Sequence, residues 1–511
     1  MNSKLKLNIY ELCKSVSIIR MKSLGFFNLN DAKQASKYNI CFRKIHSGEI
    51  YDDRTAREVL GYTNAATFQR FRHRFTARVK SYLFLIDAHK VKRKEEEELH
   101  KEMWREVALA KILQKSGQTA NSRAIYAKVY PIAKEHEFLD IEMVILPILT
   151  SYFAYIKPNK KLYAYYQSEL DACRQQEQKS YLCAKYYDAV SNIHIFNDLR
   201  DKVSVPDLCA KYYSELKLLF EPNDYSTFRI KAYQIAIFGF QTADRHEDAL
   251  RICTEAHDYI NQKKNVQSIY KYMALKDLMN THLKMNQLDN ALTYLSEIES
   301  LGLTYNFNYF SLQSQKFQIY ACQKRYDELY ILTQHILSIR ELSQFPLRVE
   351  QWKIKEAFVQ FLCAVNLVSK ELQASLPLKP FRMRRFINQI EMYSTDKRGS
   401  NISIQVVQLL FYLKEKKYGK VAERLETLTQ YTYRYLRKDD TLRSNCFIKM
   451  LLKLPEAEYN AIRTKRYVNK YWKRLQGASF KFSLQSTETE VIPYEHLWGI
   501  IIEMIDNTKT K

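Results

Sequence analysis

The sequence predicts an all-α protein: a right-handed α-solenoid of stacked helix hairpins, preceded by a basic helical module. Gly and Pro each contribute 10 of 511 residues, whereas average proteins contain about 7% and 5%. Sheet-rich folds need turn residues at short intervals, and this chain lacks them. A short phrase also recurs along the chain, and recurrence at tens of residues is typical of helical repeats.

The recurring phrase is a polar or basic turn followed by a helix start that carries a small or aliphatic residue. It occurs at residues 119–125, 245–250, 287–292, 325–330 and 417–422. We expect the following residues to mark the second helix of successive hairpins: Ala124, Ala164, Ala210, Ala249, Ala291, Leu329 and Val421. The marks predict a period of about 40 residues and tetratricopeptide-like hairpins, each burying the apolar face of its neighbour.

Within an N-terminal module of residues 1–88, apolar spacing predicts helices over 8–24 and 30–46. A helix-turn-helix-like segment follows at 54–80. We expect Asp53 to cap its first helix over 54–60, Gly61 to end that helix, and Asn64 to begin a longer one. The long helix buries apolar residues at helical spacing, namely Phe68, Phe71, Phe75 and Val79.

Three further segments complete the predicted organisation. Residues 89–105 are rich in Lys, Arg and Glu, and we expect them to form a connecting helix, with a disordered hinge as the alternative. The solenoid covers residues 106–476, interrupted where Pro377 and Pro380 stop a helix. A tail over 477–511 ends in an amphipathic helix near 494–507, which we expect to cap the last repeat.

The charge distribution predicts an acidic partner. The formal net charge is +24, and residues 1–94 hold 20 Lys and Arg against 7 Asp and Glu. Such a basic end suits nucleic acid, an acidic protein segment or an anionic surface. Nine scattered cysteines without a C-x-x-C pair indicate reduced thiols and a cytoplasmic location. No stretch approaches 18 uncharged apolar residues, so we expect no membrane span.

The helix-turn-helix-like segment is the first candidate site. Its long helix offers groups suited to base edges in a DNA groove: Asn64, Thr67, Gln69 and Arg70. It also offers cations for phosphates: Arg72, Arg74, Arg78 and Lys80. A packed helical module without any nucleic acid is the alternative, since a short helix, a Gly and a long helix are common in all-α proteins.

Two secondary basic patches lie further along the chain. One follows the proline break and contains Arg382, Arg384 and Arg385. The other interleaves cations with aromatic residues and contains Arg463, Lys465, Arg466, Lys470, Lys473 and Arg474, after an earlier group of Arg434, Arg437, Lys438 and Arg443. Interleaved cations and rings can follow a single nucleic-acid strand, and a solvated face over an aromatic core is the alternative.

Signatures of catalysis are absent from the sequence. It contains no phosphate-binding G-x-x-x-x-G-K-[ST], no G-x-G-x-x-G, no G-x-S-x-G and no H-E-x-x-H. We therefore expect no catalytic residue, no cofactor and no metal, and an enzyme with a site in the solenoid groove is the weakest alternative.

The C-terminal region resembles a family of bacterial, Bacteroidetes-type proteins with tetratricopeptide-like helical repeats. Residues 394–399, 406–413, 435–451 and 492–498 carry the resemblance. It implies a cytoplasmic helical-repeat protein and transfers no functional residue to this chain.

The leading hypothesis is a non-enzymatic scaffold that binds a protein or peptide partner, expected to be acidic, on a concave surface. The alternative is a nucleic-acid-binding regulator, in which the N-terminal module contacts nucleic acid and the solenoid acts as a sensor or interaction domain.

Overall fold

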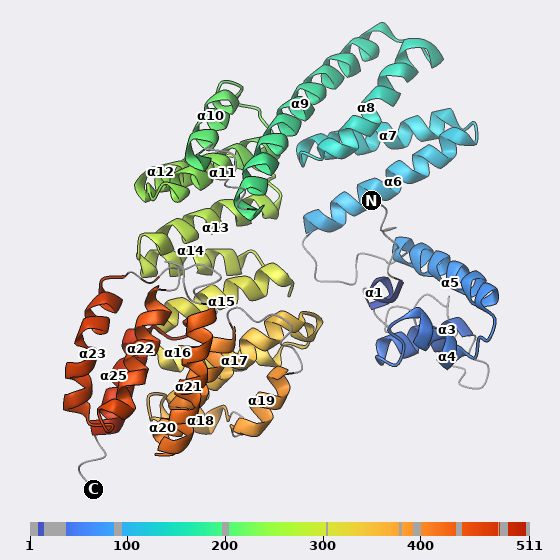
Figure 1. Cartoon of the computed structure of the whole chain (residues 1–511). Helices are drawn as coiled ribbons and strands as arrows, with labels where there is room; N and C mark the ends of the chain where they lie inside the picture. The colour runs from blue at the N-terminus through green and yellow to red at the C-terminus, as the bar shows by residue number, and fades with distance from the viewer. Residues whose placement is uncertain are drawn as a thin grey trace. The chain divides into compact units, whose positions relative to one another are not determined.

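The computed structural model describes residues 9–14, 37–85, 95–196, 204–302, 305–377, 381–391, 400–435, 442–478, 480 and 489–506. All regular secondary structure in these ranges is helical, which confirms the all-α prediction (Figure 1). The contacts divide the chain into two units, residues 1–131 and 132–511. Each unit is described here by itself.

The N-terminal unit contains five helices in the described ranges before α7: α1 (Ile9–Lys14), α3 (Lys37–His46), α4 (Asp53–Leu60), α5 (Ala65–Leu85) and α6 (Glu95–Lys115). Stacked rings form much of its core, because Tyr38 lies against both Phe71 and Phe75. The rest of the helices expected over 8–24 and 30–46 falls outside the described residues. The predicted connecting helix corresponds to α6, which is described from Glu95 and extends beyond residue 105.

Capping fixes the geometry between α4 and α5. Asp52 caps α4, since its side chain accepts a hydrogen bond from the Thr55 amide at 2.7 Å. The expectation that Asp53 is the cap was wrong by one residue, because Asp53 already lies in the helix. Gly61 ends α4 at a φ of 66°, a left-handed conformation that Gly adopts without steric cost. Asn64 begins α5 as expected, and its Oδ1 accepts from the amides of Ala66 and Thr67.

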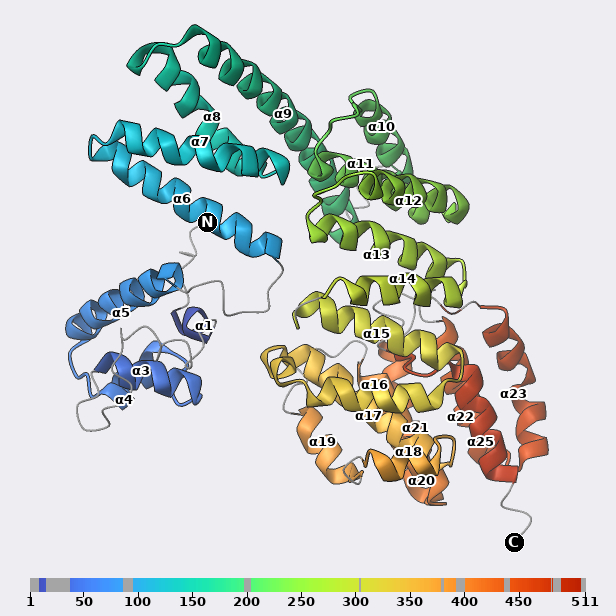
Figure 2. The same cartoon turned by 180° about the vertical axis from the view of Figure 1, so that it is seen from behind.

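In the second unit, helices pack in the order of the sequence from α8 to α17, then α17 against α20 and onward to α23 (Figures 1 and 2). Helix α7 (Thr119–Glu135) crosses the division between the units. The bounds are α8 (Leu139–Ser151), α9 (Lys160–Phe196), α10 (Val205–Lys217), α11 (Ser226–Thr242), α12 (His246–Asn261), α13 (Ser268–Lys284), α14 (Leu288–Ser300), α15 (Phe307–Cys322), α16 (Tyr326–Ser338), α17 (Pro346–Ala364), α18 (Lys370–Ser375), α19 (Met383–Glu391), α20 (Ser400–Lys414), α21 (Tyr418–Tyr435), α22 (Leu442–Glu456), α23 (Ala461–Gln476) and α25 (Tyr494–Asp506).

One turn recurs between successive helices. Its central residue has a positive φ and is Glu137, Asp244, Asn286, Lys324, Asn366, Lys416 or Glu458. The next amide bonds to the carbonyl five residues back, for example Arg245 to Phe240 at 2.9 Å. This bond satisfies a carbonyl at the helix end that would otherwise lack a partner. Buried residues then begin the following helix as expected, namely Ala249, Ala291, Leu329 and Val421.

Three of the expected marks do not occupy that buried position. Ala124, Ala164 and Ala210 are exposed. Ser122 takes the buried place after the α6–α7 turn, and α9 runs through 37 residues without a turn at Ala164. Ala has the highest helix propensity and occurs freely on exposed helix faces, so an isolated Ala does not identify a packing position.

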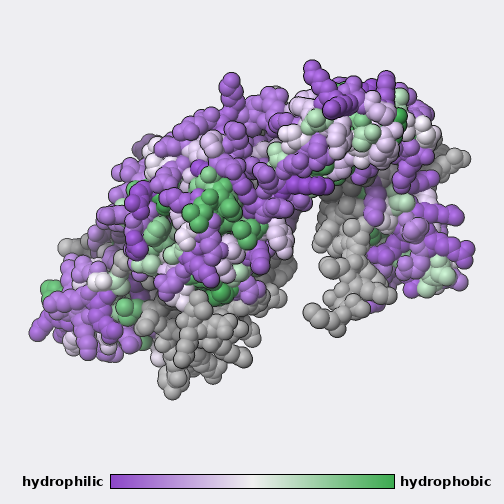
Figure 3. Space-filling view, turned by 90° about the horizontal axis from the view of Figure 1, so that it is seen from above, coloured by the Kyte–Doolittle hydropathy of each residue, from purple (hydrophilic) through white to green (hydrophobic). Residues whose placement is uncertain are grey.

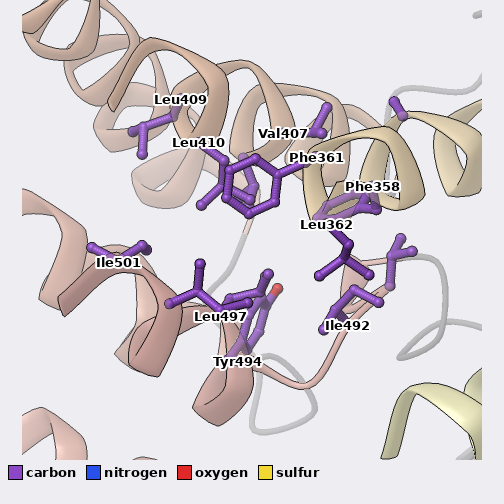
Figure 4. Close-up of a cluster of buried hydrophobic side chains, with 14 of the residues drawn as sticks. Phe358, Phe361, Leu362, Val407, Leu409, Leu410, Ile492, Tyr494, Leu497 and Ile501 are labelled. Carbon is purple, nitrogen blue, oxygen red and sulfur yellow. The ribbon is translucent and has the colours of Figure 1, made fainter. Parts of the chain in front are cut away.

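The C-terminal helix covers a large apolar core. Phe361 of α17, Leu410 of α20, and Leu497 and Ile501 of α25 meet there (Figure 4). Helix α25 also packs on α20, α22 and α23. The amphipathic helix predicted near 494–507 is therefore present as α25, and its apolar face is buried.

Among the described residues, one helical segment is long and apolar enough to cross a membrane. It runs over Leu139–Ile156, which joins α8 to a π-helical turn, η2 (Tyr152–Ile156), and 44% of it is buried inside the protein. It carries Glu142, which is buried and accepts a hydrogen bond from the Tyr225 hydroxyl at 2.7 Å. Core helices share this length and composition, so the segment is weak evidence for a span.

The surface seen in Figure 3 is mostly hydrophilic and is interrupted by a small cluster of hydrophobic residues.

Candidate functional site

Helix α5 presents most of its predicted contact residues to solvent. Phe68, Phe71, Phe75 and Val79 are buried on one side, and Thr67, Gln69, Arg70, Arg74, Arg78 and Lys80 are exposed. Helical spacing separates the exposed residues into two groups. Thr67, Arg70, Arg74 and Arg78 follow one another along one stripe, whereas Gln69 and Lys80 lie on the other flank.

Three predicted contact residues of this helix already have structural partners. The Nε of Arg72 lies 3.0 Å from Oδ1 of Asp53, and the same carboxylate oxygen accepts from the Tyr10 hydroxyl at 2.6 Å. Arg78 places its guanidinium 4.4 Å from the centre of the Tyr38 ring. The side-chain carbonyl of Asn64 accepts the hydrogen bonds that cap the start of α5.

Arg70 and Arg74 differ from these three, because they enter no ion pair or ring contact among the described residues. With Lys80 on the other flank, they are the exposed cations of α5 that remain available to a partner.

A shallow cleft of about 550 Å³ lies beside the α4–α5 turn. Its lining carries both signs of charge, since Arg54, Arg57, Asp53 and Glu58 all contribute. Arg57 is held across the turn, where its Nη2 donates to the Thr63 carbonyl at 3.0 Å. This mixture gives the cleft no preference for one sign of charge.

Helix α23 carries a face of a single sign. Its 16 residues include six Lys or Arg and no Asp or Glu. Ala461, Thr464, Val468 and Leu475 are buried. The opposite side presents Arg463, Arg466, Lys470, Lys473 and Arg474, all exposed, and we call these five residues the α23 basic face. Lys465 is exposed to one side of it. At 1.5 Å per residue, the face extends over roughly 17 Å.

Few acidic side chains compensate the α23 basic face. Arg463 pairs with Glu458 at 2.7 Å, and both side chains are mostly exposed. No other ion pair among the described residues involves the face. Tyr467, 51% exposed, stands among the cations and offers an aromatic surface.

Lys449 of α22 is a further cation next to α23, and it was not predicted from the sequence. Its side chain is exposed, and its Nζ lies 5.7 Å from the ring centre of Tyr471 on α23. It lies near Arg474, since both cations act electrostatically on the thiol of Cys446. Lys449 precedes Tyr471 by 22 positions, and that spacing does not predict that the two side chains lie close together.

Arg443, grouped with this cluster from the sequence, is not a surface cation. Its side chain is 13% exposed, and it forms ion pairs with Glu490 and Glu495 at 2.7 and 2.6 Å. That grouping was therefore wrong: burial against two carboxylates leaves Arg443 no charge to offer a partner. Arg437 and Lys438 lie outside the described residues, as does the side chain of Arg434.

The third patch is small. Arg382, Arg384 and Arg385 are exposed at the start of α19. Beneath them, Phe381 stacks on Phe411 of α20 with ring centres 4.3 Å apart, and Phe386 is buried. The aromatic residues of this patch thus anchor α19 to the core.

The cysteines are free thiols, and most are buried. Burial raises the pKa of Cys253 and of Cys183 to about 12. Such thiols remain protonated near neutral pH and are poor nucleophiles and poor ligands. Among the described residues, no group of three or more His, Cys, Asp or Glu is placed to hold a metal ion.

Comparisons with protein-family models, curated proteins and solved structures find no match to this chain. The resemblance of the C-terminal region to bacterial tetratricopeptide-like proteins therefore stays a prediction. The functional argument depends on the surfaces described above.

Proposed function

We propose that this protein is a non-enzymatic helical-repeat scaffold that binds an acidic protein or peptide segment. In this proposal, the helices between residues 106 and 476 form tetratricopeptide-like hairpins in a right-handed solenoid. The recurring turn supports the repeat, because its central residues at 244, 286, 324 and 366 lie 42, 38 and 42 residues apart. Stacked hairpins offer an extended surface to a partner.

The observation that carries the proposal is the α23 basic face. Five exposed cations lie on one side of a helix without acidic residues, and four of them have no ion-pair partner among the described residues. Like charges so close together repel one another, so the folded protein bears a cost that an anionic partner removes. An extended peptide rises about 3.3 Å per residue, so roughly five residues span the face.

Salt dependence tests the proposal. The probe is a fluorescein-labelled peptide of about ten residues in which Glu and Gly alternate, followed by fluorescence anisotropy. Binding at about 50 mM salt should weaken by tenfold or more at about 500 mM, because salt screens exposed charges. A matched peptide with Gln in place of Glu should not bind. Equal binding of the two peptides would contradict an electrostatic partner.

A second candidate function is nucleic-acid binding by the N-terminal module. The geometry that favours it is a short helix, α4, joined by the turn at Gly61–Asn64 to α5, with Arg70 and Arg74 exposed and free of ion pairs among the described residues. Helix-turn-helix proteins place the second helix in the major groove.

An electrophoretic shift of duplex DNA at low salt tests this candidate. The double variant Arg70→Glu with Arg74→Glu should abolish the shift, because it replaces two charges that attract DNA with two that repel it. Lys111→Glu with Lys115→Glu on α6 is the matched control, since both lysines are exposed in the same unit. Absence of a shift for the wild-type protein would exclude this candidate.

A further inference from the structure

A second pocket lies in the second unit, among α9, α11 and α13, and it differs in chemistry from the basic surfaces. Its volume is about 270 Å³. The lining residues are Tyr187, Val190, Ser191, Gln234, Ile235, Ile237, Phe238, Gln241 and Asp277. Asp277 is the only charged residue among them.

The carboxylate of Asp277 lacks a cationic partner. It accepts one hydrogen bond, from Nε2 of Gln234 at 3.1 Å, and no ion pair among the described residues includes it. Charged groups away from water are normally paired, because desolvation is expensive without compensation. The partly buried carboxylate of Asp277 thus has no direct ion-pair partner among the described residues, and Lys276 favours its charged form only at a distance.

Gln234, which holds the carboxylate in place, has a buried amide oxygen beside the pocket. Oε1 of Gln234 is buried and has no hydrogen-bond partner. Buried carbonyl oxygens of this kind are nearly always bonded in native proteins. Gln234 thus orients the carboxylate through its Nε2, while its own oxygen is closed off from the pocket.

The walls suit the non-polar stem of a cation. Tyr187 and Phe238 contribute rings, and Ile235 and Ile237 contribute aliphatic surface. Aromatic faces attract ammonium groups, and the attraction is stronger where water is excluded. At the roughly 30 Å³ that a water molecule occupies in the liquid, the pocket has room for about nine non-hydrogen atoms.

We infer that this pocket binds a primary alkylammonium group, with the carboxylate of Asp277 as its acceptor and Tyr187 and Phe238 against its methylene chain. A lysine side chain of a bound peptide and a free diamine share this chemistry. The inference stands apart from the α23 basic face, which attracts the opposite charge and lies on a different helix.

The groups around Asp277 set the pH range of binding. Burial raises the pKa of its carboxyl to about 6. Tyr187 from α9, Cys253 from α12 and Tyr272 from α13 lie near enough to interact electrostatically with it, and burial, together with the Asp277 charge, raises the pKa of each. Lys276 lies near enough to favour the carboxylate, and Lys284 donates to Gln241 at the pocket margin. Asp277 is thus the group that titrates between about pH 5 and 7.

Saturation-transfer NMR on the full chain tests the inference with three probes: Nα-acetyl-lysine methylamide, its norleucine counterpart and 1,4-diaminobutane. The lysine probe should show transfer to its side-chain methylenes, and the norleucine probe should show none. Tighter binding of the diamine would assign the pocket to a free amine, and tighter binding of the lysine probe would assign it to a peptide. Both results support an ammonium site.

The variant Asp277→Asn should weaken the lysine probe at least tenfold, and Asp258→Asn should leave it unchanged. Asp258 is an exposed aspartate on α12 outside the pocket lining, so it matches the change of charge. Below pH 6, affinity should fall by about tenfold per pH unit as the carboxylate takes up a proton. Equal transfer to the lysine and norleucine probes, no transfer to either amine, or unchanged affinity in Asp277→Asn would overturn the inference.

Discussion

Arg443 and Glu490 form a two-point ion pair in the C-terminal core: Nε of Arg443 lies 2.9 Å from Oε2 of Glu490, and Nη2 lies 2.7 Å from Oε1. The pair links the start of α22 to the segment that leads into α25. Glu490 is 2% exposed and also accepts from the Tyr494 amide at 2.8 Å. Both members are thus held by several bonds, which is the condition under which a buried pair is retained.

The first prediction concerns this pair. Arg443→Ala should lower the free energy of unfolding of the second unit by about 3–5 kcal/mol, because Glu490 would be left buried without compensation. Urea unfolding followed by tryptophan fluorescence measures this, since Trp352, Trp472 and Trp498 lie in that unit.

Arg463→Ala is the control for that measurement, because its pair with Glu458 is exposed. Exposed pairs contribute about 1 kcal/mol or less. Equal effects of the two substitutions would show that the Arg443 pair is not structurally important.

The second prediction is a pH dependence of stability. The pKa of Asp277 is about 6 in the folded protein and 3.8 for the free side chain. The folded state therefore binds the proton more tightly, and the resulting stabilisation is complete below pH 3.8 and lost as pH rises through 6.

Asp277→Asn removes this titration. The variant should be more stable than the wild type at pH 7.5, by an amount on the order of 2 kcal/mol, and the difference should vanish near pH 4. Thermal unfolding at the two pH values checks this. A variant that is less stable at pH 7.5 would show that the carboxylate is stabilised rather than desolvated.

The third prediction concerns the α4–α5 turn. Gly61 has a φ of 66°, and a Cβ there would meet no neighbour within 4 Å. Gly61→Ala should therefore lower the stability by about 1 kcal/mol, because the only penalty is that a residue with a Cβ must adopt the left-handed conformation. Amides of α4 should exchange with deuterium roughly fivefold faster.

Gly419→Ala provides the comparison for Gly61. It lies in the first turn of α21 at an ordinary φ, also with open space around its Cβ position. Ala should be tolerated or slightly stabilising there. A larger loss of protection in Gly419→Ala than in Gly61→Ala would contradict the conformational argument.

Local features of the fold could be predicted from the sequence. Gly61 ends α4 and Asn64 begins α5. Both could be predicted because the conformational preference of Gly and the capping preference of Asn act within a few residues. The turns before Ala249, Ala291 and Leu329 also follow local rules, since each ends one helix at a residue with positive φ and the next helix begins directly after it. The uninterrupted α9 could not be predicted, because exposed Ala and Tyr fit a long helix as well as a hairpin.

Most of the site features that could not be predicted depend on contacts between residues that are far apart in the sequence. Arg443 resembled a surface cation, and its carboxylate partner lies 47 residues away. The α9–α11–α13 pocket was missed for the same reason, although a weak signal existed. Gln234 and Asp277 are 43 residues apart, as are Gln241 and Lys284. Polar residues recurring at about the predicted repeat length indicate side chains that meet on neighbouring helices.

The most direct test of the central claim is charge reversal on the α23 basic face. Arg466→Glu, Lys470→Glu and Lys473→Glu together should weaken the Glu-Gly peptide at least tenfold at about 50 mM salt, because three attractive charges become repulsive. The matched control reverses Lys157, Lys160 and Lys161, three exposed lysines before and at the start of α9. A loss confined to the α23 variant is the predicted result, and equal affinity of both variants and the wild type would contradict the account.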